Sequence, residues 1–120
     1  MGNLKILAVD DSATMRSLVQ QTLGIGGYEV TLASDGKDGI DKFGDSSFDL
    51  VITDINMPVM DGITFIREVR KRNTDVPILT LTTESEENVK QKGAEAGANG
   101  WIIKPFRPAQ FLDIIKQVLQ

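Results

Sequence analysis

The 120-residue sequence contains no histidine and no cysteine. Without cysteine no disulfide can form, and without either residue type the usual zinc sites cannot be built. Serine–histidine–aspartate and cysteine–histidine nucleophiles are excluded for the same reason, and so is a phosphohistidine within the chain. Any chemistry must therefore come from carboxylates, hydroxyls, lysine, arginine or backbone groups.

The sequence also lacks an excess of positive charge and any long apolar run. Lysine and arginine number 13 against 17 aspartates and glutamates, which gives a formal net charge of −4. This balance argues against a nucleic-acid-binding or anionic-membrane surface. The longest apolar runs are of strand length, too short for a membrane span or a signal-peptide core. We therefore expect a cytoplasmic chain that folds as a single domain.

Five short runs of apolar and threonine residues alternate with segments of helical periodicity. Four runs are nearly continuous, as expected for strands covered on both faces, whereas the second alternates in a way that favours a sheet edge. This alternation predicts parallel strands joined by right-handed crossovers, in an open doubly wound α/β sheet. The predicted strands are residues 5–9, 29–33, 50–53, 78–82 and 101–103.

Apolar residues at three- and four-residue spacing predict a helix after four of these strands. The segment 84–96 differs, because Val89 is its one large apolar residue and the interior Gly93 costs about 1 kcal/mol relative to alanine. We expect it to be the least firmly packed of five helices. The four apolar stripes are Met15, Leu18, Val19, Thr22 and Leu23; Ile40 and Phe43; Ile63, Ile66 and Val69; and residues 111–119.

Polar groups follow four of the five predicted strands, and ligands in open parallel sheets bind beyond the carboxyl ends of strands. Asp10, Asp11 and Asp54 would bring three carboxylates together if the first and third strands are neighbours. Such a cluster holds its protons tightly unless a cation offsets it, and Mg²⁺ prefers these oxygen ligands. Asp54 could then attack phosphorus as a nucleophile, with Thr82 and Lys104 neutralising the phosphoryl oxygens.

Each of these residues also has a plainer interpretation. Asp11 or Ser12 could cap the following helix, and an isolated aspartate such as Asp54 is usually a loop or cap residue. Lys104 could be a solvated charge and Thr82 an ordinary β-branched strand residue. Trp101 could be a half-buried edge aromatic or a residue with a switching role, and the sequence leaves both open. The whole constellation favours a phosphate and metal site.

At these residues the sequence resembles the receiver domain of two-component response regulators. The resemblance covers essentially all 120 residues, so we expect residues 1–120 to form a single receiver domain with no output domain. It implies a flavodoxin-like sheet of order 2-1-3-4-5 with five helices. Among receivers the chain is most similar to the CheY family of stand-alone chemotaxis regulators. The matching residues are Asp10–Asp11, Asp54–Pro58, Asp61–Gly62, Thr82 and Lys104–Phe106.

The resemblance also implies a Mg²⁺ cofactor. Asp11 and Asp54 would ligate it through their carboxylates. Asn56 would use its backbone carbonyl, and Asp10 would act close to the metal, partly through water. These four residues are therefore the metal-binding positions that we expect.

The same resemblance implies a phosphorylation-activated signalling switch rather than an enzyme. Asp54 would accept a phosphoryl group from a sensor histidine kinase, Thr82 would hydrogen-bond that group, and Lys104 would pair with it. Thr82 and the aromatic residue at position 101 would form the switch. Trp101 stands where the best-known members have tyrosine, and an indole donates only through its ring nitrogen. We therefore expect Thr82, more than Trp101, to carry the switch. Thr83 stands where a small residue is often found, which predicts slower access of water or a phosphatase to Asp54.

The expected partners are a sensor histidine kinase, a flagellar motor switch protein and a phosphatase, with no nucleic acid and no membrane insertion. We expect a monomer. An alternative is a phosphorelay intermediate or another stand-alone receiver outside chemotaxis. A small aspartate-nucleophile phosphatase is less favoured, because its nucleophile would follow the first strand. A flavin-binding module would need a phosphate-cradling loop after Val9, where this chain is acidic.

Overall fold

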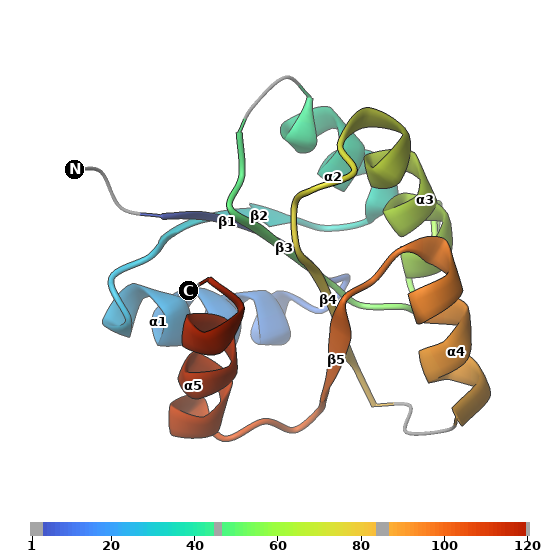
Figure 1. Ribbon diagram of the computed structural model, residues 1–120. Coiled ribbons are helices and arrows are strands. Elements are labelled where there is room, and N and C mark those ends of the chain that lie inside the picture. The colour runs from blue at the N-terminus through green and yellow to red at the C-terminus, as the bar shows by residue number, and fades with distance from the viewer. Residues whose placement is uncertain (1–3, 45–46, 84–86, 120) are drawn as a thin grey trace.

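The computed structural model describes residues 4–44, 47–83 and 87–119, in which five strands alternate with five helices (Figure 1). All five predicted strands are confirmed, the last with one additional residue at its start. The elements are β1 (Lys5–Val9), α1 (Ala13–Ile25), β2 (Glu29–Ala33), α2 (Gly36–Phe43), β3 (Leu50–Thr53), α3 (Gly62–Arg72), β4 (Ile78–Thr82), α4 (Glu87–Ala96), β5 (Gly100–Ile103) and α5 (Pro108–Val118).

The strands form one parallel sheet of order β2-β1-β3-β4-β5, as the resemblance implied. The second strand lies at an edge, which confirms the prediction from its alternating pattern. The first and third strands are neighbours, and Val9 lies opposite Thr53 in their register. Because the next residue on each strand is an aspartate, this register alone brings Asp10 and Asp54 together.

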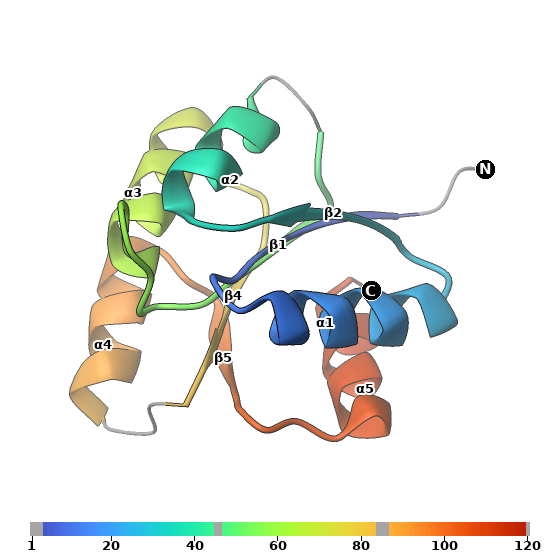
Figure 2. The same cartoon turned by 180° about the vertical axis from the view of Figure 1, so that it is seen from behind.

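Two helical layers cover the sheet, with α1 and α5 on one face and α2, α3 and α4 on the other (Figures 1 and 2). Alternate residues of β1 enter different cores, Ile6 on the α1 and α5 side and Leu7 on the other. The central strand β3 and its neighbour β4 are buried along their whole length. They therefore provide a rigid base for the residues that follow them.

Helix ends match the capping signals of the sequence. The Ser12 hydroxyl accepts a hydrogen bond from the Met15 N–H at 3.2 Å, so the serine caps α1. Asp35 caps α2 and Asp61 caps α3 in the same way. Gly26 caps the end of α1, and Gly27 after it adopts a φ of 85°, where a side chain would be strained.

The buried helix faces differ from the predicted stripes in some places. Leu18 remains 37% exposed, whereas Phe65, outside the predicted stripe of α3, is completely buried and Ile63 only partly so. The last helix buries Phe111 and Ile115 fully and leaves the flanking apolar residues half-buried. A helix that lies on a sheet buries a narrower arc of its surface than the arc over which its apolar residues are spread.

The weakly apolar helix predicted after the fourth strand is present as α4. The prediction began it at residue 84, but residues 84–86 lie outside the described part of the chain, and α4 as described begins at Glu87. Among the side chains described in α4, the buried positions are Gly93 and Ala96, both small. No helix within the described residues is long and apolar enough to cross a membrane.

Candidate functional site

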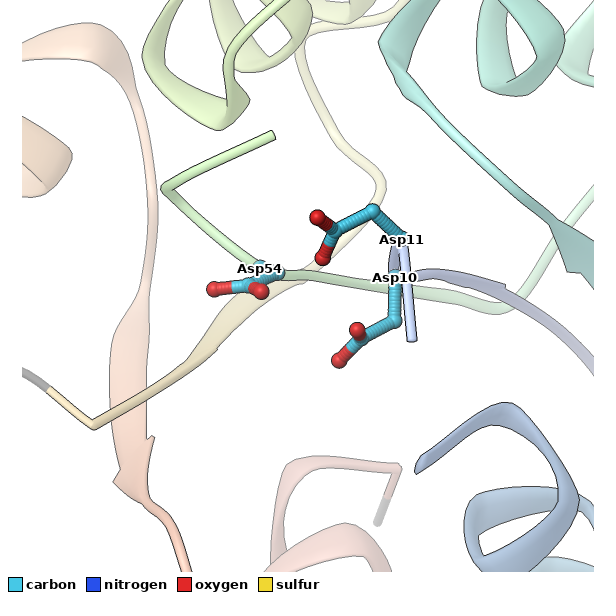
Figure 3. Close-up of side chains that lie close together, drawn as sticks. All are labelled: Asp10, Asp11 and Asp54. Carbon is cyan, nitrogen blue, oxygen red and sulfur yellow. The ribbon is translucent and has the colours of Figure 1, made fainter. Parts of the chain in front are cut away.

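Three aspartates converge where β1 and β3 end. Oxygens of the Asp10, Asp11 and Asp54 carboxylates lie within 4.8 Å of one another, and Figure 3 shows the three side chains around a common space. Asp10 and Asp54 are only 4% and 7% exposed, while Asp11 is exposed. The structure therefore brings together the three carboxylates that the strand ends predicted.

Asp10 is held at every polar group. Its N–H donates to the Ala33 carbonyl at 3.1 Å, and its Oδ1 accepts from the Ser12 N–H at 2.9 Å. Its Oδ2 accepts from the Lys104 ammonium at 2.7 Å. Of the two predicted candidates for the cap of α1, Asp11 and Ser12, the Ser12 hydroxyl takes the role. Asp10 is thus fixed at the end of β1 and faces the lysine.

Asp54 follows the buried strand β3 directly. Its Oδ1 accepts from the Ile55 N–H at 2.7 Å, and its Oδ2 lies 3.2 Å from Lys104 Nζ. Burial raises the pKa of Asp54 and the nearby Asp10 charge adds to the increase, although Lys104 opposes both. The ionised Asp54 carboxylate is therefore poorly stabilised by its surroundings, which favours binding of a further cation or reaction with an electrophile.

Lys104 comes after the edge strand β5 and joins both buried carboxylates. Burial tends to lower its pKa, but the hydrogen bond to Asp10 and the charges of Asp54 and Asp10 outweigh burial, so the net pKa is raised. The Lys104 N–H also donates to the Thr82 carbonyl at 2.8 Å. The lysine is therefore a buried, permanent cation whose backbone is tied to the end of β4.

The other predicted site residues are Thr82, Asn56 and Trp101, and they differ in burial and in the strand that places them. Thr82 ends β4 and is buried at 2% exposure, beside the strand that carries Asp54. Asn56 lies two residues beyond Asp54 with an exposed side chain. Trp101 does not join the carboxylates; it is 47% exposed on β5, and Lys90 Nζ lies 4.5 Å from its ring centroid. Trp101 is thus an exposed edge aromatic in this structure.

The donor set fits a magnesium ion. Every charged group of the cluster apart from Lys104 is a carboxylate, which is a hard oxygen ligand of the kind that Mg²⁺ prefers. Within the described residues the Asp11 carboxylate accepts no hydrogen bond, so both of its oxygens are open to an ion. Asp11 and Asp54 could bind the ion directly, with Asp10 close by and the Asn56 carbonyl as a further oxygen.

One contact at the site was not predicted from the sequence. Arg16 Nη1 donates to the backbone carbonyl of Asp10 at 2.7 Å. A signal existed in the sequence, since a cation near the start of a helix opposes the helix dipole. Arg16 is the fourth residue of α1, and the first turn of that helix carries no acidic residue.

Sequence comparisons agree with this geometry. The family described as the response regulator receiver domain matches residues 6–116. The PhoP regulator of alkaline phosphatase synthesis from Bacillus subtilis is 37% identical over 98% of this chain, which covers 49% of that protein. The sensor protein EvgS of Escherichia coli is 39% identical over 94% of this chain, which covers 9% of the sensor. The chain thus spans half or less of the length of these relatives.

Solved structures give the same result. The chemotaxis protein CheY4 of Vibrio cholerae is 44% identical, with a TM-score of 0.95 over 98% of this chain and 100% of that one. A CheY-like receiver domain protein from Methanospirillum hungatei is 29% identical, with a TM-score of 0.93 over 98% and 94% of the two chains. The family match, the sheet order and the three converging aspartates together place this chain in the response regulator receiver domain family.

Proposed function

We propose that this chain is a phosphorylation-operated switch in which Asp54 accepts a phosphoryl group from the phosphohistidine of a sensor histidine kinase. Receiver domains take phosphoryl groups from such kinases. The observation that carries the assignment to Asp54 is its placement: the side chain is nearly buried, it follows a rigid strand, and it has Lys104 Nζ at 3.2 Å and two further carboxylates beside it. These 120 residues contain no histidine, so the phosphohistidine that donates the group lies outside them.

The transfer forms one bond and breaks one. An Asp54 carboxylate oxygen attacks phosphorus, the phosphorus–nitrogen bond of the donor breaks, and the imidazole leaves with the bonding electron pair and takes up a proton. Receiver domains bind Mg²⁺ at this acidic pocket, where the ion would offset the negative charge of the phosphoryl oxygens. Lys104 already contacts Asp54, so its ammonium is placed to pair with a phosphoryl oxygen, and the Thr82 hydroxyl would donate to another.

The signal would leave the site through the end of β4. Thr82 is joined through its carbonyl to Lys104, and the chain continues from β4 toward α4, whose described buried positions are small residues. Movement of Thr82 toward the phosphoryl group would therefore shift α4, for which the sequence predicts weak packing, and its Lys90–Trp101 contact. A coupling free energy of about 1–3 kcal/mol between phosphorylation and partner binding is sufficient for such a switch.

For the pathway, we favour chemotaxis control of the flagellar motor. The similarity to Vibrio cholerae CheY4 over nearly all of both chains supports this choice. The partners would be the kinase, a motor switch protein and a phosphatase, and the chain would act as a monomer in the cytoplasm. The similarity to a transcriptional regulator and to a segment of a sensor protein supports the alternative, a receiver in another pathway or a phosphorelay.

Intact-mass spectrometry with acetyl phosphate tests the phosphoacceptor. The wild-type protein should gain the mass of one phosphoryl group in Mg²⁺ and none in excess chelator, and Asp54→Asn should gain none. Asp113→Asn, which removes an exposed carboxylate from α5, is the matched control and should label like wild type. Undiminished labelling of Asp54→Asn would assign the phosphoryl group to another residue.

Binding to purified partners separates the pathways. A motor switch protein should bind the phosphorylated chain more tightly than the unphosphorylated one. Transfer of the phosphoryl group from Asp54 to a histidine phosphotransfer domain, without tighter binding to the motor protein, would instead support the phosphorelay.

A further inference from the structure

The contact between Arg16 and Asp10 lies beside the proposed magnesium site but involves no carboxylate. Arg16 Nη1 donates to the Asp10 backbone carbonyl at 2.7 Å in a partly buried position. The arginine backbone is fixed by α1, where its own N–H donates to the Ser12 carbonyl at 2.9 Å. Side chains of a helix point toward its N-terminus, so the guanidinium reaches back over the turn that joins β1 to α1.

Two local contributions to the free energy oppose this arrangement. A cation in the first turns of a helix opposes the positive end of the helix dipole, and ordering an arginine side chain restricts many rotamers. The first turn of α1 offers no acidic partner that would compensate. The favourable term is the short hydrogen bond from a charged donor to the Asp10 carbonyl.

The position of the Asp10 carbonyl limits the direction in which the Asp11 side chain can point. It belongs to the planar peptide between Asp10 and Asp11, so holding it fixes the plane from which the Asp11 side chain departs. The Asp10 carboxylate has independent anchors, the Ser12 N–H and the Lys104 ammonium. The Asp11 carboxylate is exposed and accepts no hydrogen bond within the described chain, so of the described contacts only those of its backbone limit where its rotamers can place it.

We propose that Arg16 is a positioning residue that, by fixing the Asp10–Asp11 peptide, directs the Asp11 carboxylate into the magnesium site. This inference rests on the proposed function, because it assumes that Asp11 is a metal ligand. Outer groups that orient metal ligands commonly change metal affinity by about 10–100-fold when they are removed. Arg16 would act in this way through the backbone rather than through a ligand side chain.

Titration calorimetry with MgCl₂ alone provides the test. Arg16→Met should weaken Mg²⁺ binding by about tenfold or more, and Arg16→Lys, which restores a charged donor of similar reach, should recover most of the loss. Arg67→Met is the matched control, because it removes the same charge from an exposed position on α3 and should bind Mg²⁺ like wild type. Circular dichroism identifies a temperature at which every variant is folded, and the titrations are run at that temperature.

A second measurement needs no metal. In chelator, Arg16→Met should shift the Asp11 and Ser12 backbone amide resonances while those of the last turn of α3, which lies on the other face of the sheet, stay unchanged. A stability effect alone would not produce this pattern. If Arg16→Met does not fold, Arg16→Gln takes its place, since glutamine is too short to reach the carbonyl and should lose the same affinity.

The outcomes separate this inference from the proposed function. Mg²⁺ affinity of folded Arg16→Met or Arg16→Gln equal to wild type would overturn the positioning role. So would an equal loss in Arg67→Met, which would indicate a long-range effect of charge, or an Arg16→Lys variant as weak as Arg16→Met. A wild-type protein that binds no Mg²⁺ and takes no label from acetyl phosphate would instead overturn the proposed function.

Discussion

Lys104 is the cation that holds the two buried carboxylates of the site together. Its Nζ lies 2.7 Å from Asp10 Oδ2 and 3.2 Å from Asp54 Oδ2, and its side chain is only 11% exposed. Removing one partner from a buried ion pair leaves the remaining charges uncompensated. Its proposed role in catalysis therefore builds on a role in folding.

Lys104→Met should lower the free energy of unfolding by about 3 kcal/mol in chelator, because both carboxylates lose their counter-charge. Mg²⁺ should restore part of this loss, since an ion at the carboxylates supplies positive charge again. Urea denaturation with and without MgCl₂ measures both effects. A variant as stable as wild type in chelator would show that the ion pair adds nothing to folding.

The raised pKa of Asp54 predicts how stability depends on pH in the absence of metal. The folded protein keeps this proton at pH values where the unfolded chain has released it. The stability from this group is therefore full below the ordinary aspartate pKa and falls as pH rises through the folded-state pKa. Asp54→Asn cannot ionise, so it should gain stability relative to wild type from acid to neutral pH.

Urea denaturation in chelator across this pH range gives the comparison. A difference between Asp54→Asn and wild type that stays constant with pH would contradict the raised pKa. Saturating Mg²⁺ should reduce the advantage of the variant, because the ion stabilises the charged form of Asp54.

Val59, in the loop between β3 and α3, has a φ of 69° and is 79% exposed. This left-handed conformation is strained for a β-branched residue and tolerated by asparagine. Val59→Asn should therefore raise the free energy of unfolding by about 1 kcal/mol, with little burial lost. Thermal unfolding of the variant beside wild type tests this, and an unchanged or lower midpoint would contradict the strain.

At the scale of elements, α3 gives the sharpest contrast between pattern and packing. The sequence pattern selected Ile63, Ile66 and Val69, but Phe65 is completely buried while Ile63 is only partly so. Phe65→Ala should lower the free energy of unfolding by about 3–5 kcal/mol, clearly more than Ile63→Ala. Chemical denaturation of both variants ranks them, and an equal or reversed order would contradict the observed burial.

The strands were predictable because apolar runs of strand length, separated by helical periods, leave few alternatives. Helix faces were less so: periodicity gives a stripe but not its centre, which depends on how the helix sits on the sheet. This is why Leu18 was expected in the core and Phe65 was not. The start of α4 cannot be compared, since residues 84–86 lie outside the described chain.

At the scale of the whole molecule, the topology carries the site. Because β1 and β3 are neighbours in a parallel sheet, residues separated by more than forty positions meet at one edge, as the sequence predicted for the three aspartates. The contacts of Lys104 with Asp10 and of Arg16 with a backbone carbonyl depend on the paths of long side chains; the place of Arg16 near a helix start marks that residue in the sequence but does not give its partner. The contact of Trp101, on the edge strand β5, with Lys90 of α4 likewise depends on side-chain packing that the sequence pattern does not give.

The absence of histidine also acquires a meaning at this scale. The 120 residues can hold the accepting aspartate of a phosphotransfer but not a histidine donor, so the phosphohistidine must lie outside them. The most direct test is transfer from the purified, phosphorylated catalytic region of a sensor histidine kinase. In Mg²⁺ the label should leave the kinase and appear on wild type and Asp113→Asn but not on Asp54→Asn; label that stays on the kinase, or that appears equally on Asp54→Asn, would contradict the account.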